Sequence, residues 1–207
     1  MHTRLSKFVF ALALSALALP VFAQQAKTIR IDDMPKLSKQ HLLKKAPELT
    51  VRSSDIKQSN AKPMNWAYFE TEYSVAAAKA GDSKWIDDLA INYYVMTQGV
   101  GEDGKSEYNL FTLTEHYWNV AKGSKHKAAV VLPPVAMERF GMPIAFAVEI
   151  SDGESDPVSK SSEGKAPEDW WTNEKYTSQT VTRDGYLVDR SKTLFQFVNP
   201  DDYETVK

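Results

Sequence analysis

Large hydrophobic side chains alternate with polar ones in most segments after residue 65, and this period of two restricts the folds open to the chain. In residues 66–75, Phe69, Tyr73 and Val75 fall on one face. In residues 85–97 one face carries four apolar side chains: Leu89, Ile91, Tyr93 and Val95. Such alternation is typical of strands with one buried face, and sustained helical periodicity is almost absent. The sequence therefore predicts a mainly β protein.

The spacing of the turns predicts the architecture. We expect about eight strands after residue 65, over 66–75, 85–97, 108–120, 126–132, 143–150, 175–182, 186–189 and 193–198. A Gly-Glu-Asp-Gly hairpin turn lies at 101–104, one helical turn is expected at 135–140, and a flexible polar loop is expected over 151–169. The pattern favours a two-layer antiparallel sandwich of immunoglobulin-like architecture, with a closed barrel as the alternative.

Residues 1–23 have the features of a secretory signal peptide. Arg4 and Lys7 precede an apolar run over 8–19, and Ala23 is a small residue at the expected cleavage position. The run is shorter than the ~20 residues that a membrane-spanning helix needs. We expect cleavage after Ala23, export to the periplasm or the outer cell surface, and no transmembrane segment in the mature chain.

Residues 24–64 differ in composition from the rest, being rich in lysine, serine and glutamine and free of aromatic residues. Ile29 and Ile31 alternate with charged residues, which indicates a short strand. A short helix is expected over 38–45, with Leu42 turned inward and Pro47 beyond its end. We interpret the region as an N-terminal arm or linker before a sandwich domain at 65–207. Packing along that domain and binding of a partner are the alternatives to a solvated linker.

Composition excludes several functional classes. The chain has 207 residues and no cysteine, so disulfide scaffolds, thiolate metal sites and cysteine nucleophiles are ruled out. Loss of Arg4 and Lys7 with the signal peptide lowers the formal net charge from −2 to −4. Nucleic acids and anionic membrane surfaces require clustered basic charge, so we expect neither as a partner.

Two adjacent tryptophans, Trp170 and Trp171, are the first candidate contact residues. They lie beside Glu168 and Asp169. Exposed aromatic rings stack on sugars or on partner proteins, and carboxylates bind sugar hydroxyls. In a strand the two rings would point to opposite faces, so burial of at least one in the core is the alternative.

An acidic loop is the candidate metal site. Its carboxylates occupy positions one, three, five and twelve of a calcium-loop spacing: Asp152, Glu154, Asp156 and Glu163. Pro157 stands at position six, where such a loop needs glycine, and Lys160 stands at position nine. A solvated acidic loop is therefore the alternative, and no cofactor is expected.

Nucleophilic enzyme motifs are absent from the sequence. It has no Gly-x-Ser-x-Gly elbow and no phosphate-binding glycine loop between a strand and a helix. The 27 acidic residues leave open a glycoside hydrolase with two facing carboxylates, because such a pair is defined by its separation in space. We nevertheless expect a protein without enzymatic activity.

Three segments carry a resemblance to a known group of proteins. They are the strand WAYFETEY at 66–73, the long strand over 85–97, and HKAAVVLPPVAMERFG at 126–141. Together with the signal peptide and the lysine-rich arm, they resemble secreted immunoglobulin-like proteins associated with type IV-like pilus clusters of mucin-degrading gut bacteria. The resemblance covers about residues 65–200 and implies a β-sandwich at the cell envelope with a capacity for self-association. It carries over no catalytic residue.

The sequence thus supports one leading function and two alternatives. The leading hypothesis is an exported sandwich that binds envelope or pilus proteins, or further copies of itself, through a sheet face or an edge strand. A carbohydrate-binding module that uses Trp170 and Trp171 is the first alternative. A glycoside hydrolase with a carboxylate pair is the second.

Overall fold

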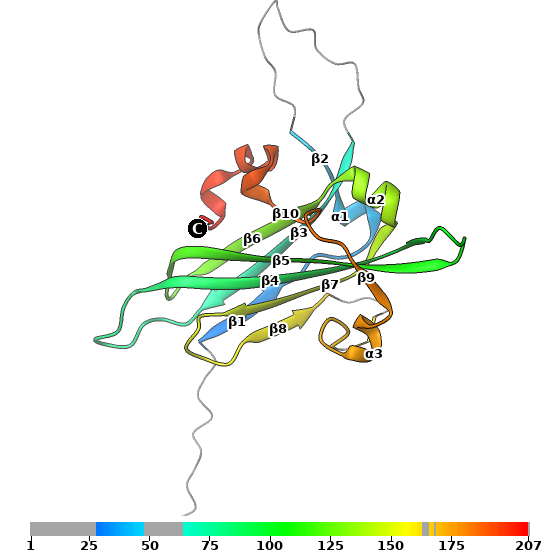
Figure 1. Cartoon of the computed structure of the whole chain (residues 1–207). Coiled ribbons are helices and arrows are strands. Elements are labelled where there is room, and N and C mark those ends of the chain that lie inside the picture. The colour runs from blue at the N-terminus through cyan, green and yellow to red at the C-terminus, as the bar shows by residue number, and fades with distance from the viewer. Residues whose placement is uncertain (1–27, 48–63, 163–165, 168, 207) are drawn as a thin grey trace, which may run out of the picture.

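Two β-sheets pack face to face in a computed structural model that describes residues 28–47, 64–162, 166–167 and 169–206 (Figure 1). The predicted signal peptide lies outside these residues. Within the described part of the chain, no helix is long and apolar enough to cross a membrane. The predicted sandwich is confirmed, and its strands are arranged in two five-stranded sheets.

The first sheet has the strand order β1-β3-β6-β10, with β2 also paired to β3. Its strands are β1 (Ile29–Asp33), β2 (Leu43–Lys45), β3 (Asn65–Val75), β6 (Lys125–Leu132) and β10 (Val188–Asp189). All of its pairings are antiparallel. The eight-residue register between β3 and β6 forms its centre.

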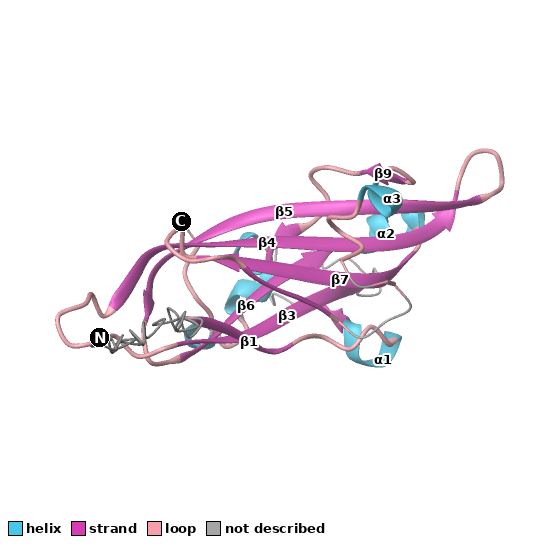
Figure 2. Ribbon diagram, turned by 90° about the horizontal axis from the view of Figure 1, so that it is seen from below, coloured by secondary structure: helices cyan, strands magenta, loops and turns pink. Residues whose placement is uncertain are grey.

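The second sheet has the order β8-β7-β4-β5-β9. Its strands are β4 (Trp85–Val100), β5 (Ser106–Ala121), β7 (Met142–Ser151), β8 (Val158–Ser161) and β9 (Thr180–Thr182). The long β4–β5 hairpin spans the whole body and extends beyond it (Figure 2). β9 is the one parallel strand among the described pairings of this sheet.

The strand order is that of an immunoglobulin sandwich. The series β1-β3-β6 matches strands A, B and E, and β8-β7-β4-β5 matches strands G, F, C and C′ of a variable-type domain. β10 occupies the place of strand D beside β6, although it comes late in the sequence. The immunoglobulin-like architecture therefore holds without the cysteine pair of antibody domains.

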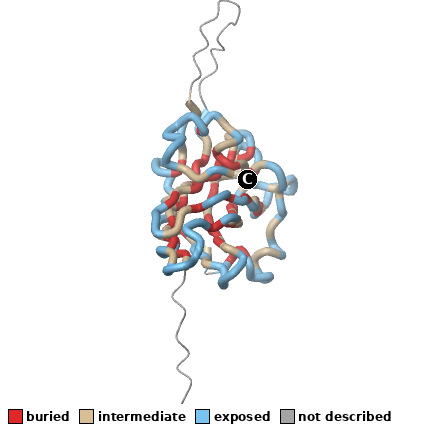
Figure 3. The backbone as a smooth tube through the Cα atoms, turned by 90° about the vertical axis from the view of Figure 1, so that its left-hand side faces the viewer, coloured by how far each residue is buried: buried red, intermediate tan, exposed pale blue. Residues whose placement is uncertain are grey.

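The core lies between the inner faces of the two sheets, as the buried tube segments of Figure 3 show. Phe69 of β3 stacks on Phe146 of β7, with ring centroids 4.8 Å apart. Leu89, Ile91 and Val95 are fully buried, as their alternation predicts. Each such side chain contributes about 1.5–3 kcal/mol to the free energy of folding, so the alternating pattern is the main source of stability.

A short helix, α2 (Pro134–Phe140), joins β6 to β7 at one end of the sandwich. It occupies the position of the predicted helical turn and ends at Gly141, whose φ is 88°. A Cβ atom at Gly141 would lie 1.9 Å from the carbonyl oxygen of Gln98 in β4. Glycine is therefore required for α2 to pack against the hairpin.

Two strand predictions in the last third of the chain are wrong in detail. The predicted strand at 193–198 is a 3₁₀ helix, η2 (Leu194–Phe197), because the hydroxyl of Thr193 caps it by accepting from the backbone N–H of Phe195. The predicted strand at 175–182 divides into α3 (Glu174–Thr177) and β9. The predicted flexible loop contains β8, which pairs with β7.

The described part of the predicted N-terminal arm belongs to the sandwich. β1 pairs with β3, and Ile29, Ile31 and Leu42 are buried in the main core. The short helix α1 (Lys39–Leu42) precedes β2. The predicted boundary at residue 65 therefore does not separate a linker from a domain, because these apolar side chains complete the first sheet.

Candidate functional site

Trp170 and Trp171 are both buried, at 0% and 6% exposure. They pack edge to face and fold over the outer surface of the second sheet, against Met96, Leu110 and Ala147. The indole N–H of Trp170 donates to the hydroxyl of Ser161, 3.2 Å away. The prediction of an exposed contact pair is wrong for these two residues, because the segment that carries them closes one end of the sheet and leaves no ring face for a ligand.

The acidic loop is held by its own backbone. The Asp152 carboxylate accepts hydrogen bonds from the backbone N–H groups of Glu154 and Ser155, at 3.1 and 2.9 Å. Burial would raise the pKa of Asp152, but these N–H groups and the Ser155 hydroxyl lower it. Glu163 lies outside the described residues, and Asp156 is exposed. Among the described residues no group of three His, Cys, Asp or Glu side chains could hold a metal ion.

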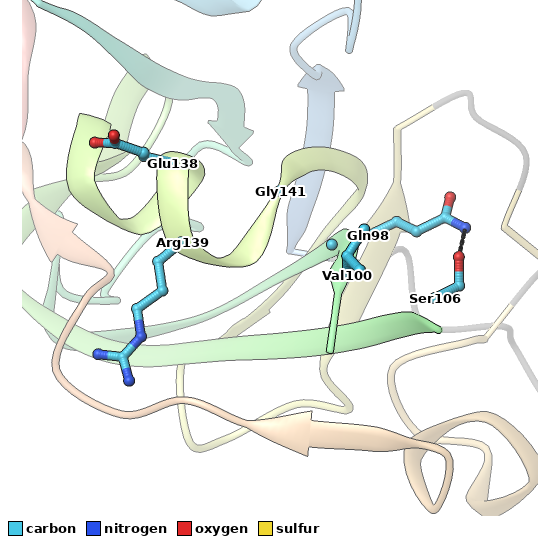
Figure 4. Close-up of a pocket in the computed structure, with 7 residues that line it drawn as sticks. Gln98, Val100, Ser106, Glu138, Arg139 and Gly141 are labelled. Carbon is cyan, nitrogen blue, oxygen red and sulfur yellow. Dashed lines mark hydrogen bonds between the residues drawn. The ribbon is translucent and has the colours of Figure 1, made fainter. Parts of the chain in front are cut away.

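A cleft lies between the β4–β5 hairpin and α2 (Figure 4). It has a volume of about 490 Å³, and Glu138 is the only carboxylate among its lining residues. Glu138 and Arg139 project from α2 in different directions, while Gln98 donates to the hydroxyl of Ser106 across the hairpin. An adjoining cleft of about 620 Å³ continues toward the hairpin tip.

Two of the three carboxylates that line the adjoining cleft, Asp103 and Glu107 but not Glu102, pair with basic groups. Glu107 pairs with Arg183 at 2.9 Å, and Asp103 pairs with Lys105 at 3.3 Å. The Arg183 guanidinium also donates to Asn109 and lies 4.7 Å from the ring centroid of Phe140. These contacts join β5, α2 and the segment after β9, so we interpret this cluster as a brace at the end of the sandwich.

One edge of the second sheet is open over a short window. β9 pairs with β5 at residues 108–110, and the backbone N–H of Arg183 donates to the carbonyl of Leu110. At the other end, Trp118 N–H donates to the carbonyl of Thr205, and Tyr117 forms a bridge with Val206. Residues 111–115, called the β5 window below, lie between these two blocks.

The backbone hydrogen-bonding groups of alternate residues in the β5 window point away from β4. Backbone groups of alternate residues face the same side of a strand, so Thr112 and Thr114 face the side of Leu110 and Trp118. Neither threonine makes a backbone hydrogen bond on that side to any described residue. The window therefore offers two N–H donors and two carbonyl acceptors to an added strand.

The opposite side of the sandwich is blocked. The ammonium group of Lys160 in β8 donates to the carbonyls of Ile31 and Asp32 in β1, at 3.4 and 3.2 Å. This side chain spans from the edge of one sheet to the edge of the other. A lysine placed in this way protects an edge strand against pairing with other chains.

The C-terminal tail, residues 203–206, closes the end of the β5 window. Its Glu204 carboxylate pairs with the buried imidazole of His126 in β6, and its Glu204 N–H donates to the carbonyl of Lys127. Burial would lower the pKa of His126, but the hydrogen bond and charge of Glu204 and the Ala121 carbonyl raise it. The tail thus connects β6 of one sheet to β5 of the other.

The sequence interpretation missed the β5 window and the tail. The window lies inside a predicted strand. Which part of that strand's edge stays unpaired depends on the positions of other segments, and these could not be predicted from the strand itself. His126 opens the predicted strand over 126–132, and Glu204 follows the last predicted strand, so nothing in the sequence pairs the two. Thr112 and Thr114, at alternate positions of β5, were the only available signal of an open edge.

Comparisons with known proteins bear on the fold. A family model matches residues 23–207. A crystal structure of a protein from Akkermansia muciniphila superposes with a TM-score of 0.67 at 24% identity, covering 86% of this chain and 93% of that chain. At this identity the likeness shows the fold alone. No curated protein matches the chain.

Proposed function

The chain belongs to the family whose model matches residues 23–207. From that premise we propose that it is an exported, non-enzymatic sandwich. It binds a protein partner in the cell envelope, in a pilus-associated assembly. The observation that carries this proposal is the β5 window, an open stretch of a sheet edge in a molecule that blocks its other side with Lys160.

The window limits the shape of the partner. β9 and Thr205 lie beside β5 at either end of residues 111–115. A strand that continues within a broad sheet, including β5 of a second copy, would collide with these two blocks. A short extended segment, such as a chain terminus or a loop of the partner, fits between them and pairs by strand addition.

The number of backbone contacts sets the expected affinity. Four added hydrogen bonds contribute about 0.5–1.5 kcal/mol each, or about 2–6 kcal/mol together, which alone gives a dissociation constant of tens of micromolar at best. Side chains beside the window must supply the rest. The exposed His116 lies on the outer face beside the window, and Lys192 pairs with Glu115 of the window at 2.7 Å.

Affinity capture from envelope extract of the producing organism tests the proposal. The bait is the chain from Gln24 to Lys207, compared with Thr114→Pro and Thr114→Val. Proline removes one outward N–H without breaking a bond to β4, whereas valine keeps that N–H. We expect one set of proteins to be retained by the wild type and the valine variant and lost with proline. Equal retention by all three, or retention of none, would contradict it.

A further inference from the structure

The half of the second sheet's outer face that Trp170 and Trp171 leave uncovered carries a polar array with an aromatic ring at its end. Its members are Asp88, Asn92, Thr114, His116, Trp118 and Glu149, which come from β4, β5 and β7. They occupy successive cross-strand positions: Asn92 lies between Thr114 and Glu149, and Asp88 is opposite Trp118.

Hydrogen bonds hold the array in one arrangement. Thr114 donates to the Asn92 amide oxygen at 2.7 Å, and the Asn92 amide nitrogen donates to Glu149 at 3.2 Å. The His116 ring pairs with Asp88 at 2.8 Å. All of these side chains stand on long strands, which position groups more precisely than loops do.

Exposure distinguishes this array from the buried tryptophan pair. Trp118 is 46% exposed, and the side chains of His116 and Asp88 are 45% and 44% exposed. Because the adjacent Tyr117 points into the core, Trp118 lies on the outer face with its cross-strand neighbour Asp88.

The chemistry of the array selects among ligands. Carboxylate and amide oxygens accept from hydroxyl groups, and the amide N–H₂ donates to them, while an indole covers an apolar ring face. Two carboxylates and one imidazole leave no net positive charge for an anionic ligand. The half-buried ring of Tyr94 stands six residues from Asp88 along β4, so the surface between the aromatic ends is roughly 20 Å long.

We propose that this face binds a neutral oligosaccharide, with Trp118 stacking on one sugar ring and Asn92, Glu149 and Asp88 bonding to hydroxyl groups. The length of the array suits several linked rings rather than one. The site shares His116 with the surroundings of the β5 window, but it binds through side chains of the sheet face whereas the window binds through backbone groups of the sheet edge. It does not depend on the proposed protein partner.

Calorimetric titration with cellotetraose, chitotetraose and maltotetraose tests the proposal, together with a sulfated chondroitin tetrasaccharide as the charged comparison. Trp118→Ala removes the stacking ring, and Trp118→Phe keeps an aromatic face. Trp85→Ala is the matched control, because Trp85 is 51% exposed and lies outside the array. Thermal unfolding of each variant shows that it is folded.

We expect at least one neutral tetrasaccharide to bind, with affinity reduced about tenfold by Trp118→Ala, partly restored by Trp118→Phe and unchanged by Trp85→Ala. Binding of the sulfated tetrasaccharide alone would overturn the proposal, as would no binding of any neutral one. Equal weakening by both alanine variants would also overturn it. A protein partner whose capture requires Trp118, without sugar binding, would assign the face to that partner instead.

Discussion

His126 and Glu204, 78 positions apart, form an ion pair that fastens the end of the chain to β6. The other imidazole nitrogen lies 2.7 Å from the carbonyl oxygen of Ala121. Both partners are hydrogen-bond acceptors, so only the doubly protonated ring satisfies them together. The tail that borders the β5 window is therefore held by a protonated histidine.

This pair makes stability depend on pH. Because the folded-state pKa of His126 is raised above 6.5, its contribution is complete below pH 6.5 and is lost as the pH rises through the folded-state value. We expect urea unfolding to show a falling free energy of unfolding above pH 6.5 in the wild type. Glu204→Gln should flatten that fall, whereas His116→Gln should leave it in place. An NMR titration that gives His126 a pKa at or below 6.5 would refute this explanation.

The buried tryptophan pair predicts a stability effect. Trp170 is fully buried, so Trp170→Ala leaves a cavity and should lower the free energy of unfolding by about 3–5 kcal/mol. Trp85→Ala, at a half-exposed position, should cost about 1 kcal/mol or less. Denaturant titration of the two variants checks this. Equal decreases in the free energy of unfolding of the two variants would mean that packing of Trp170 against the second sheet does not stabilise the fold.

Gly141 and Gly153 allow backbone strain to be separated from a steric clash. Both have positive φ, but a Cβ atom at Gly153 would meet nothing within 4 Å, whereas at Gly141 it would meet the Gln98 carbonyl. Gly153→Ala should lower the free energy of unfolding by about 1 kcal/mol, because alanine is strained at positive φ even where its Cβ atom meets no neighbour. Gly141→Ala should cost about 3 kcal/mol or more, since α2 must also move. The difference between their urea midpoints measures the contact, and similar midpoints would show that α2 shifts freely.

The fold was predictable where alternation was strong. The five long strands after residue 65 follow from side chains such as Phe69, Leu89 and Phe146. Apolar residues that recur at every second position share one face in a strand but not in a helix. The short β8 was missed because it is polar and owes its form to pairing with β7. The 3₁₀ helix at Leu194 was missed because a hydroxyl cap outweighs the alternation there.

The candidate site was less predictable than the fold. Trp170 and Trp171 attracted attention by their adjacency, but a turn places both against the same sheet face, which the strand rule does not foresee. Trp118 lies within the predicted strand over 108–120, and only the cross-strand register shows its polar neighbours. The β5 window depends on Thr205 and β9, which lie far away in the sequence.

Hydrogen exchange of the Thr112 and Thr114 amides, measured on the ¹⁵N-labelled chain alone and bound to the captured envelope protein, tests the central claim most directly. In the free chain both amides should exchange faster than those paired with β4, because they face the open edge. In the complex both should be slowed by about tenfold or more, as strand addition requires. Unchanged exchange at these two positions, with protection elsewhere on the molecule, would contradict binding at the β5 window.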